Sequence, residues 1–145
     1  MLAIAFPVHI DRPADEVFDY VTDPANLAAW QDTTVAVIPE TDGPLAKGTC
    51  LREIRRGPFG REITNRVEIS EFEPNRRFGL RMLSGPLPIH GEYTFHAVGS
   101  QTRLDFVAYG ELQGPVRLMK PILRRLLRRN FERYHATLKR LLEES

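Results

Sequence analysis

The sequence predicts an α+β fold, in which a curved antiparallel sheet of about six to seven strands is covered by a long C-terminal helix, with two short helices after the first strand. Three observations predict it. Apolar and polar residues alternate from residue 33 to residue 112, with short turns between the runs. After residue 115 the apolar period changes to that of a helix. Helix-start signals follow the first apolar run.

Composition fits one folded unit. The chain has 145 residues, which suits a single domain over residues 1–145 with one core. Hydrophobic residues make up 42% and charged residues 27%, which excludes overall disorder. No apolar run approaches the ~20 residues of a membrane-spanning helix, and the first residues do not resemble a signal peptide. Cys50 is the only cysteine, so no intramolecular disulfide forms and we expect a cytoplasmic protein.

The first strand is expected around residues 4–10, where apolar residues recur at every second position. Pro7 lacks an N–H group, so this strand should have a free edge or a bulge there. A short helix should follow, because Pro13 suits a first turn and acidic residues come directly after it. Asp23 and Pro24 then end this helix and begin a second one that reaches Trp30.

The middle of the chain is predicted to form a series of strands. Short turns join them, which makes neighbours along the chain antiparallel partners. One of these turns is expected at Ser84-Gly85-Pro86. The expected strands are residues 33–39, 48–56, 62–72, 77–83, 89–98 and 102–112.

The last element is predicted as one helix over residues 116–142, roughly 40 Å long. Pro121 would start or kink it. One helix of this length crosses the whole sheet, and a twisted sheet covered by a single helix leaves a cavity between the two. The apolar stripe of this helix consists of Leu118, Met119, Ile122, Leu123, Leu126, Leu127, Phe131, Tyr134, Leu138, Leu141 and Leu142.

Charge is unevenly distributed. Residues 115–145 have nine basic and three acidic residues, or +6, whereas the remainder has a net charge of −5. The basic segment is either the solvated face of a helix docked on an acidic body or a contact surface. No nucleic acid is expected, since the pI is only about 8.0. Transient contact with a membrane surface is expected through Arg124, Arg125, Arg128 and Arg129.

The segment from Ile10 to Trp30 resembles the opening signature of the SRPBCC superfamily, which includes START-like and birch-pollen-allergen-like proteins. Its polyketide cyclase/dehydrase branch is the most similar. Further agreements in order and spacing are residues 47–49, 60–62, 72–78, 91–95, 102–104 and 128–131. The resemblance implies a helix-grip fold with a deep apolar cavity. Members bind lipids, quinones, sterols or polyketides, and some are cyclases or dehydratases.

Neither a metal site nor a cofactor is expected. The four histidines are His9, His90, His96 and His135, and none has a partner at metal-ligand spacing. Cys50 has no histidine close in sequence, and Gly57-Pro58-Phe59-Gly60 is interpreted as a hairpin turn rather than a phosphate loop.

General acid–base chemistry has one candidate set: Glu53, Asn65 and Tyr93. The strand around residues 49–54 has two possible phases. In the favoured phase Leu51 and Glu53 face inward, and in the other Arg52 and Ile54 do. Glu53 would then lie near Asn65, a polar residue on an apolar face that needs a partner. In the simpler interpretation Glu53 pairs with Asn65, a water or an arginine. Tyr93 would orient a ligand oxygen.

Three functions are compatible with these features. The first is a binding protein that holds an apolar or aromatic ligand, such as a lipid, quinone or polyketide. The second is a cyclase or dehydratase, and the third is an interaction protein using the basic helix at a membrane or protein surface. The chain is expected to be a monomer or homodimer. The expected ligand-binding residues are Trp30, Leu51, Glu53, Asn65, Val67, Phe78, Leu80, Met82, Tyr93, Phe106, Met119 and Leu123.

Overall fold

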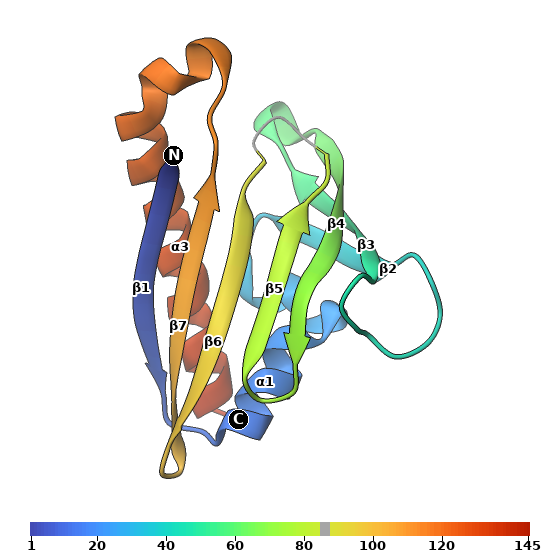
Figure 1. Ribbon diagram of the computed structural model, residues 1–145, viewed down its shortest axis with the longest axis vertical. Coiled ribbons are helices and arrows are strands. Elements are labelled where there is room, and N and C mark those ends of the chain that lie inside the picture. Colours follow the sequence, from blue (N-terminus) through green and yellow to red (C-terminus); the bar gives the residue numbers. More distant parts are fainter. Residues whose placement is uncertain (85–87) are drawn as a thin grey trace.

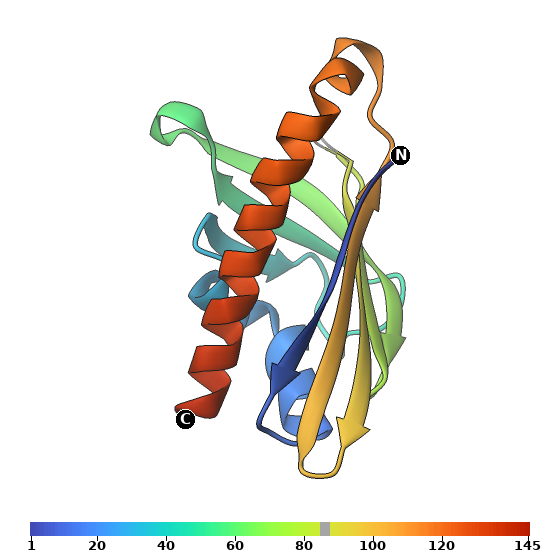
Figure 2. The same ribbon diagram turned by 90° about the vertical axis from the view of Figure 1, so that its left-hand side faces the viewer.

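A computed structural model describes residues 1–84 and 88–145. Its centre is a seven-stranded antiparallel sheet wrapped around the long helix α3, which crosses it from end to end (Figures 1 and 2). The strand order is β1-β7-β6-β5-β4-β3-β2. The strands are β1 (Leu2–Ile10), β2 (Thr34–Pro39), β3 (Cys50–Arg56), β4 (Glu62–Glu73), β5 (Arg77–Met82), β6 (His90–Val98) and β7 (Gln101–Gly110).

The helices are where the sequence signals indicate. They are α1 (Ala14–Thr22), the 3-10 turn η1 (Pro24–Asn26), α2 (Leu27–Trp30), η2 (Pro58–Gly60), η3 (Gly114–Met119) and α3 (Lys120–Glu143). The Asp23 side chain accepts a hydrogen bond from the backbone N–H of Ala25, so it caps the turn as expected. Of the short helices, α1 lies at the end of the sheet that is remote from η3 (Figure 1).

The prediction of a free edge at Pro7 is confirmed, because β1 is an edge strand that pairs only with β7. One expected boundary, the start of the C-terminal helix, needs correction. Residues 114–119 form a separate 3-10 helix, so the α-helix begins at Lys120, and Pro121 lies in its first turn. Pro121 needs no N–H partner there, so it starts α3 instead of kinking it. The turn expected at Ser84-Gly85-Pro86 lies, from residue 85 onward, outside the described residues.

The core lies between the concave face of the sheet and α1, α2 and the C-terminal half of α3. Aromatic rings make up much of it: Phe18 packs edge-on against Phe72 and Phe95, with ring centroids 5.5 and 5.1 Å apart. The buried residues of α3 are Tyr134, His135, Leu138 and Leu142, all in its second half. The apolar stripe expected along the whole helix therefore faces the core over only part of its length.

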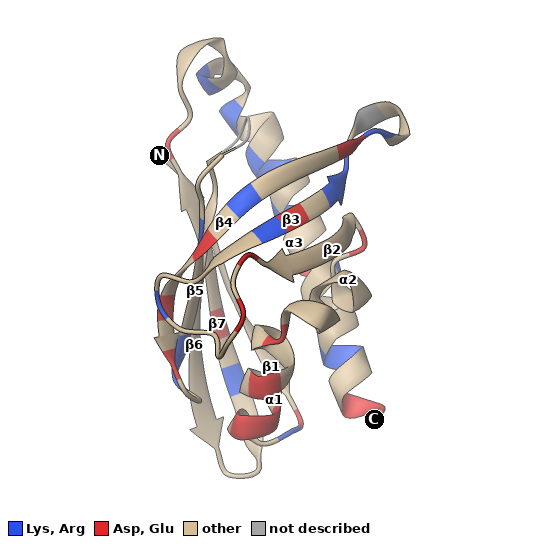
Figure 3. Ribbon diagram, turned by 90° about the vertical axis from the view of Figure 1, so that its right-hand side faces the viewer, with Lys and Arg blue, Asp and Glu red and all other residues tan. Residues whose placement is uncertain are grey.

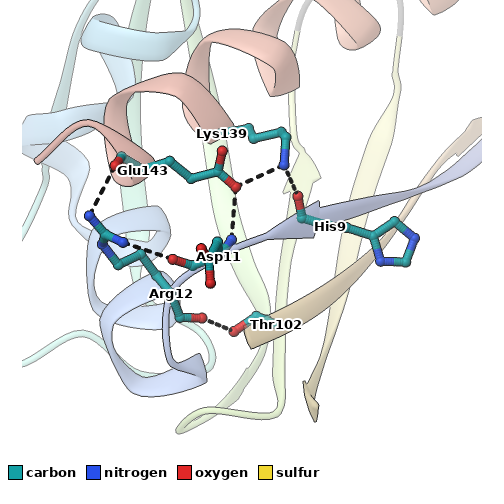
Figure 4. Close-up of polar contacts among 6 residues, drawn as sticks. All are labelled: His9, Asp11, Arg12, Thr102, Lys139 and Glu143. Atoms are coloured by element: carbon teal, nitrogen blue, oxygen red, sulfur yellow. Dashed lines mark hydrogen bonds and ion pairs between the residues drawn. The ribbon is translucent and has the colours of Figure 1, made fainter. Parts of the chain in front are cut away.

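A polar network fastens the C-terminal end of α3 to the strand and loop that precede α1 (Figure 4). Glu143 accepts hydrogen bonds from the backbone N–H of Asp11 and from Lys139 Nζ, each at 2.8 Å. Lys139 also donates to the carbonyl of His9, and Arg12 donates to the carbonyl of Glu143 at 3.0 Å. This end of the helix therefore has a fixed position on the body.

Candidate functional site

A cavity of about 480 Å³ lies between the concave face of the sheet and α3. Its size suits a small organic molecule. The walls are mostly apolar and come from β3, β4, β5, β6 and β7 on the sheet and from α1, α2 and α3 on the other side. The cavity reaches the exposed residues Arg56, Ile63 and Ser84, so its mouth lies between the β3–β4 hairpin, the end of β5 and the middle of α3.

Most of the expected ligand-binding residues lie in the cavity wall. They are Trp30, Glu53, Asn65, Val67, Phe78, Leu80, Met82, Tyr93 and Phe106. The strand phase is the favoured one: Leu51 and Glu53 are buried, whereas Arg52 is exposed. Alternation along β3 and β4, which pair antiparallel, places Glu53 opposite Asn65.

Three of the expected residues are outside the wall. Leu51 is fully buried in the core and does not reach the cavity. Met119 belongs to η3 and is half exposed, because the α-helix starts only after it. Leu123 packs instead against a second apolar cluster formed by Leu2, Ile4 and Leu112.

None of the α3 residues that line the cavity was among the expected ligand-binding residues, although three of them belong to the expected apolar stripe. The α3 residues of the wall are Leu127, Asn130, Phe131, Tyr134 and His135. The signal was available for His135, since it lies four residues after Phe131 and three before Leu138. Those spacings put it on the same apolar face of the helix. Arg55 and Arg56 were missed because they belong to the strand end at the mouth.

Tyr93 and His135 form a buried hydrogen-bonded pair in the cavity wall. The Tyr93 hydroxyl lies 2.7 Å from His135 Nε2, and His135 Nδ1 lies 2.6 Å from the carbonyl oxygen of Phe131. A carbonyl only accepts, so Nδ1 carries the proton. Burial lowers the pKa of His135 to about 4, although the Phe131 carbonyl opposes this, so the ring is neutral at pH 7.

The neutral His135 ring therefore accepts at Nε2, and Tyr93 donates to it. Burial raises the pKa of Tyr93 well above its usual value, so the phenol stays protonated. Its one proton is engaged by His135, and its oxygen keeps lone pairs that accept. Tyr93 is consequently a hydrogen-bond acceptor toward a ligand rather than a ready acid.

Two polar atoms of the wall have no hydrogen-bond partner among the described residues, the indole Nε1 of Trp30 and Oδ1 of Asn65. Both are buried. Leaving such groups without a partner costs about 1–3 kcal/mol each. The Glu53 carboxylate is engaged: Arg55 Nε donates to its Oε1 at 2.8 Å. Of the partners considered for Glu53 from the sequence, the structure therefore shows an arginine.

No group of three or more metal-ligating side chains occurs in the part of the chain that the structure describes. His90 and His96 lie on the convex side of β6, where the His90 ring packs at a tilt against Tyr109, with centroids 5.5 Å apart, and His96 Nε2 lies 3.0 Å from Asp105 Oδ2. Within residues 1–84 and 88–145, none of the helices has the length and apolar character to cross a membrane.

Comparison with solved structures finds the same fold in other proteins. A START superfamily protein from Mycobacterium smegmatis matches with a TM-score of 0.83 at 14% identity, covering 99% of both chains. The Zhui aromatase/cyclase from Streptomyces sp. R1128 matches with a TM-score of 0.78 at 17% identity, covering 97% of this chain and 93% of the other. A Thermus thermophilus protein matches with a TM-score of 0.78 at 18% identity, covering 95% of this chain and 94% of the other.

At these identities the similarity shows the fold alone. No curated protein matches the chain. The model of one family, described as polyketide cyclase / dehydrase and lipid transport, matches residues 1–143. With this match over nearly the whole length, the chain belongs to the polyketide cyclase/dehydrase and lipid transport family, and its helix-grip fold is that of its START-like structural neighbours.

Proposed function

We propose that this protein binds a small apolar or aromatic molecule that carries at least one polar group, such as a hydroxyl or carbonyl. The observation that carries the proposal is the pair of buried polar atoms without partners, Trp30 Nε1 and Asn65 Oδ1, in the wall of a mostly apolar cavity within the described part of the chain. The indole N–H needs an acceptor and the amide oxygen needs a donor. A ligand hydroxyl supplies both the acceptor and the donor, while the hydrocarbon part of the ligand fills the apolar remainder of the cavity.

The lining explains how such a ligand is oriented. Phe78, Tyr93 and Phe106 present rings to the cavity, with the Tyr93 and Phe106 centroids 5.0 Å apart. An aromatic ligand packs favourably among them. Arg55 and Glu53 provide a charged pair closer to the mouth. The apolar end of the ligand would therefore lie among the rings, and its polar group would face Trp30 and Asn65.

Binding of 2-naphthol compared with naphthalene tests this proposal by calorimetry or fluorescence. We expect 2-naphthol to bind more tightly, and Trp30→Phe to weaken it by about tenfold, since one hydrogen bond contributes roughly 1 kcal/mol or more. Trp30→Phe should leave naphthalene almost unaffected. Gly91→Leu should abolish both, because a Cβ at Gly91 meets only Phe106 Cε1, at 3.6 Å, and a longer side chain enters the cavity.

Equal affinity for the two probes in wild type would show that the two polar atoms do not select the ligand. Unchanged binding in Gly91→Leu would move the binding site away from the cavity. Native mass spectrometry of protein purified from its own host then identifies the natural ligand class.

A second candidate is a cyclase or dehydratase, favoured by the buried carboxylate of Glu53 at the cavity. Glu53 would take a proton from a C–H group next to a ligand carbonyl, and an Asn65 amide N–H would stabilise the resulting enolate oxygen. Tyr93, as an acceptor, would position the substrate. Deuterium exchange into a 1,3-diketone measures this step: Glu53→Gln should abolish protein-dependent exchange while diketone binding remains. Exchange at the protein-free rate in wild type rejects the enzyme.

The other expected partner of this protein is an anionic membrane surface. The arginines Arg124, Arg125, Arg128 and Arg129 are surface-exposed or half-exposed on α3, as expected of a contact with an anionic membrane.

A further inference from the structure

Exposed apolar side chains gather around the cavity mouth. They come from three separate elements: the β3–β4 hairpin, the end of β5, and η3 with the first half of α3. We define the mouth surface by these side chains, and it holds most of the large exposed apolar residues of the described chain. Its members are Phe59, Ile63, Leu83, Leu118, Met119, Ile122 and Leu126.

Apolar side chains of η3 and of the first half of α3 form a row. Leu118, Ile122 and Leu126 follow one another at intervals of four residues, with exposed fractions of 88%, 57% and 52%. Neither the sheet nor the short helices cover this row. A globular protein rarely exposes a contiguous apolar row unless it binds something.

Basic side chains run beside this row. Arg125 and Arg129 are also four residues apart and have no ion-pair partner in the described ranges. Arg124 and Arg128 are tied to the body, the first by a hydrogen bond to the Ala3 carbonyl and the second by Glu132 and the Phe6 ring. Together with Lys120 and Pro121, the four arginines line a shallow groove on the outer side of α3.

Charge separates the two ends of the molecule (Figure 3). The segments at the mouth, residues 54–64 and 111–130, have nine basic and two acidic residues, a net charge of +7. The loop and helix at the opposite end, residues 11–23, have five acidic residues and one basic residue, a net charge of −4. An anionic surface would therefore attract the protein with its mouth foremost.

Phe59 is a second, independent indication that the mouth surface contacts another molecule or a membrane. It is fully exposed at the tip of the β3–β4 hairpin, and its backbone lies in the left-handed region, with φ of 61°. A bulky residue is unfavourable there, where Gly or Asn is preferred. The Phe59 ring has no role in the packing of the core clusters.

We propose that the mouth surface docks on an anionic lipid bilayer, with the apolar side chains in the interface and the arginines against the headgroup phosphates. The combination of an apolar row and flanking arginines is the pattern of an interfacial helix. Apolar groups on three separate elements with arginines between them suit an occupant that deforms around them, as a bilayer does. That the cavity then opens toward the bilayer for ligand transfer rests on the proposed function; the docking itself does not.

Co-sedimentation of the full chain with phosphatidylcholine vesicles, with and without a third of phosphatidylserine, tests the proposal. We expect clear binding only to the anionic vesicles, decreasing as ionic strength rises. Arg125→Glu with Arg129→Glu should lower the partition coefficient at least about tenfold. Ile122→Ser with Leu126→Ser should lower it by about tenfold as well.

Matched controls separate the surface from total charge and total hydrophobicity. Arg76→Glu with Arg77→Glu makes the same charge change at the β4–β5 turn, and Ile38→Ser with Val98→Ser removes equally exposed apolar groups elsewhere. Neither pair should alter vesicle binding beyond the general effect of net charge. Phe59→Asn should weaken vesicle binding several-fold without lowering thermal stability, because Asn tolerates the left-handed conformation.

Vesicle binding that is equal in the mouth variants and their controls would overturn the proposal. So would equal binding to neutral and anionic vesicles. Saturable binding of an acidic protein without any vesicle binding would assign the surface to a protein partner instead. Gly91→Leu keeps the two proposals distinguishable: if vesicle binding persists while naphthol binding is lost, docking does not depend on the cavity.

Discussion

The two halves of α3 differ in how they meet the rest of the protein. The second half buries Tyr134, His135, Leu138 and Leu142 and is fastened at its end by Glu143. Its side chains also reach the loop after α2, where Arg133 pairs with Asp32 at 2.7 Å and Tyr134 meets Thr33 at 2.6 Å. The first half exposes its apolar row and its arginines. One amphipathic helix therefore has a structural half and a half available for contacts.

This contrast predicts where substitutions in α3 are costly. Leu138→Ala should lower the free energy of unfolding by about 2–5 kcal/mol, because Leu138 is completely buried and the deletion leaves a cavity. Urea unfolding followed by circular dichroism measures it. A loss below about 1 kcal/mol would mean that the second half is not firmly docked.

His135 should make the docked half sensitive to pH. Its pKa is lowered to about 4 in the folded protein by burial, against an ordinary value of 6.5. The unfolded chain therefore binds the extra proton first, and stability is lost as pH falls from about 6.5 toward 4, by an amount on the order of 3 kcal/mol. His135→Gln should flatten the difference between stability at pH 7 and at pH 5 or so. Parallel pH profiles for the two proteins would refute the assignment.

Glu143 should contribute less. The Lys139 ammonium and the backbone N–H of Asp11 lower the pKa of this carboxyl. Its stabilisation is present above the ordinary pKa of a glutamate and is lost as pH falls through the lowered folded-state value. Glu143→Gln should cost up to about 1 kcal/mol at pH 7 and nothing in strong acid, where both side chains are neutral. Denaturant titrations at the two pH values measure this, and a cost that persists in acid would contradict it.

The first half of α3 should tolerate change almost freely. Ile122→Ser with Leu126→Ser should alter the free energy of unfolding by no more than about 0.5 kcal/mol each, since both side chains are more than half exposed. Thermal melts alongside Leu138→Ala give the comparison directly. A destabilisation as large as that of Leu138→Ala would show that the apolar row packs on something within the chain.

Most of the fold was accessible from the sequence, because alternation and turn residues mark each strand and the Asp23-Pro24 pair marks the helix junction. The cavity wall on the strands followed from the same alternation, as Val67, Phe78 and Tyr93 illustrate. The α3 residues of the cavity wall could not be predicted in this way. An apolar period gives the direction of a stripe but not how far along it the sheet extends, so Met119 was expected inside and His135 was not placed.

The strand order has a consequence for how the chain folds. β1 pairs with β7, and their register joins Ile10 to Thr102 and Leu2 to Gly110, residues that are 92 and 108 positions apart. Closing so long a loop is entropically costly and slows folding. During synthesis β1 is made before β7, its only partner in the sheet, which follows about ninety residues later. Its apolar side chains Leu2 and Ile4, completely buried in the folded protein, stay without their packing partners on the nascent chain until β7 is made, which favours aggregation or chaperone binding at this strand.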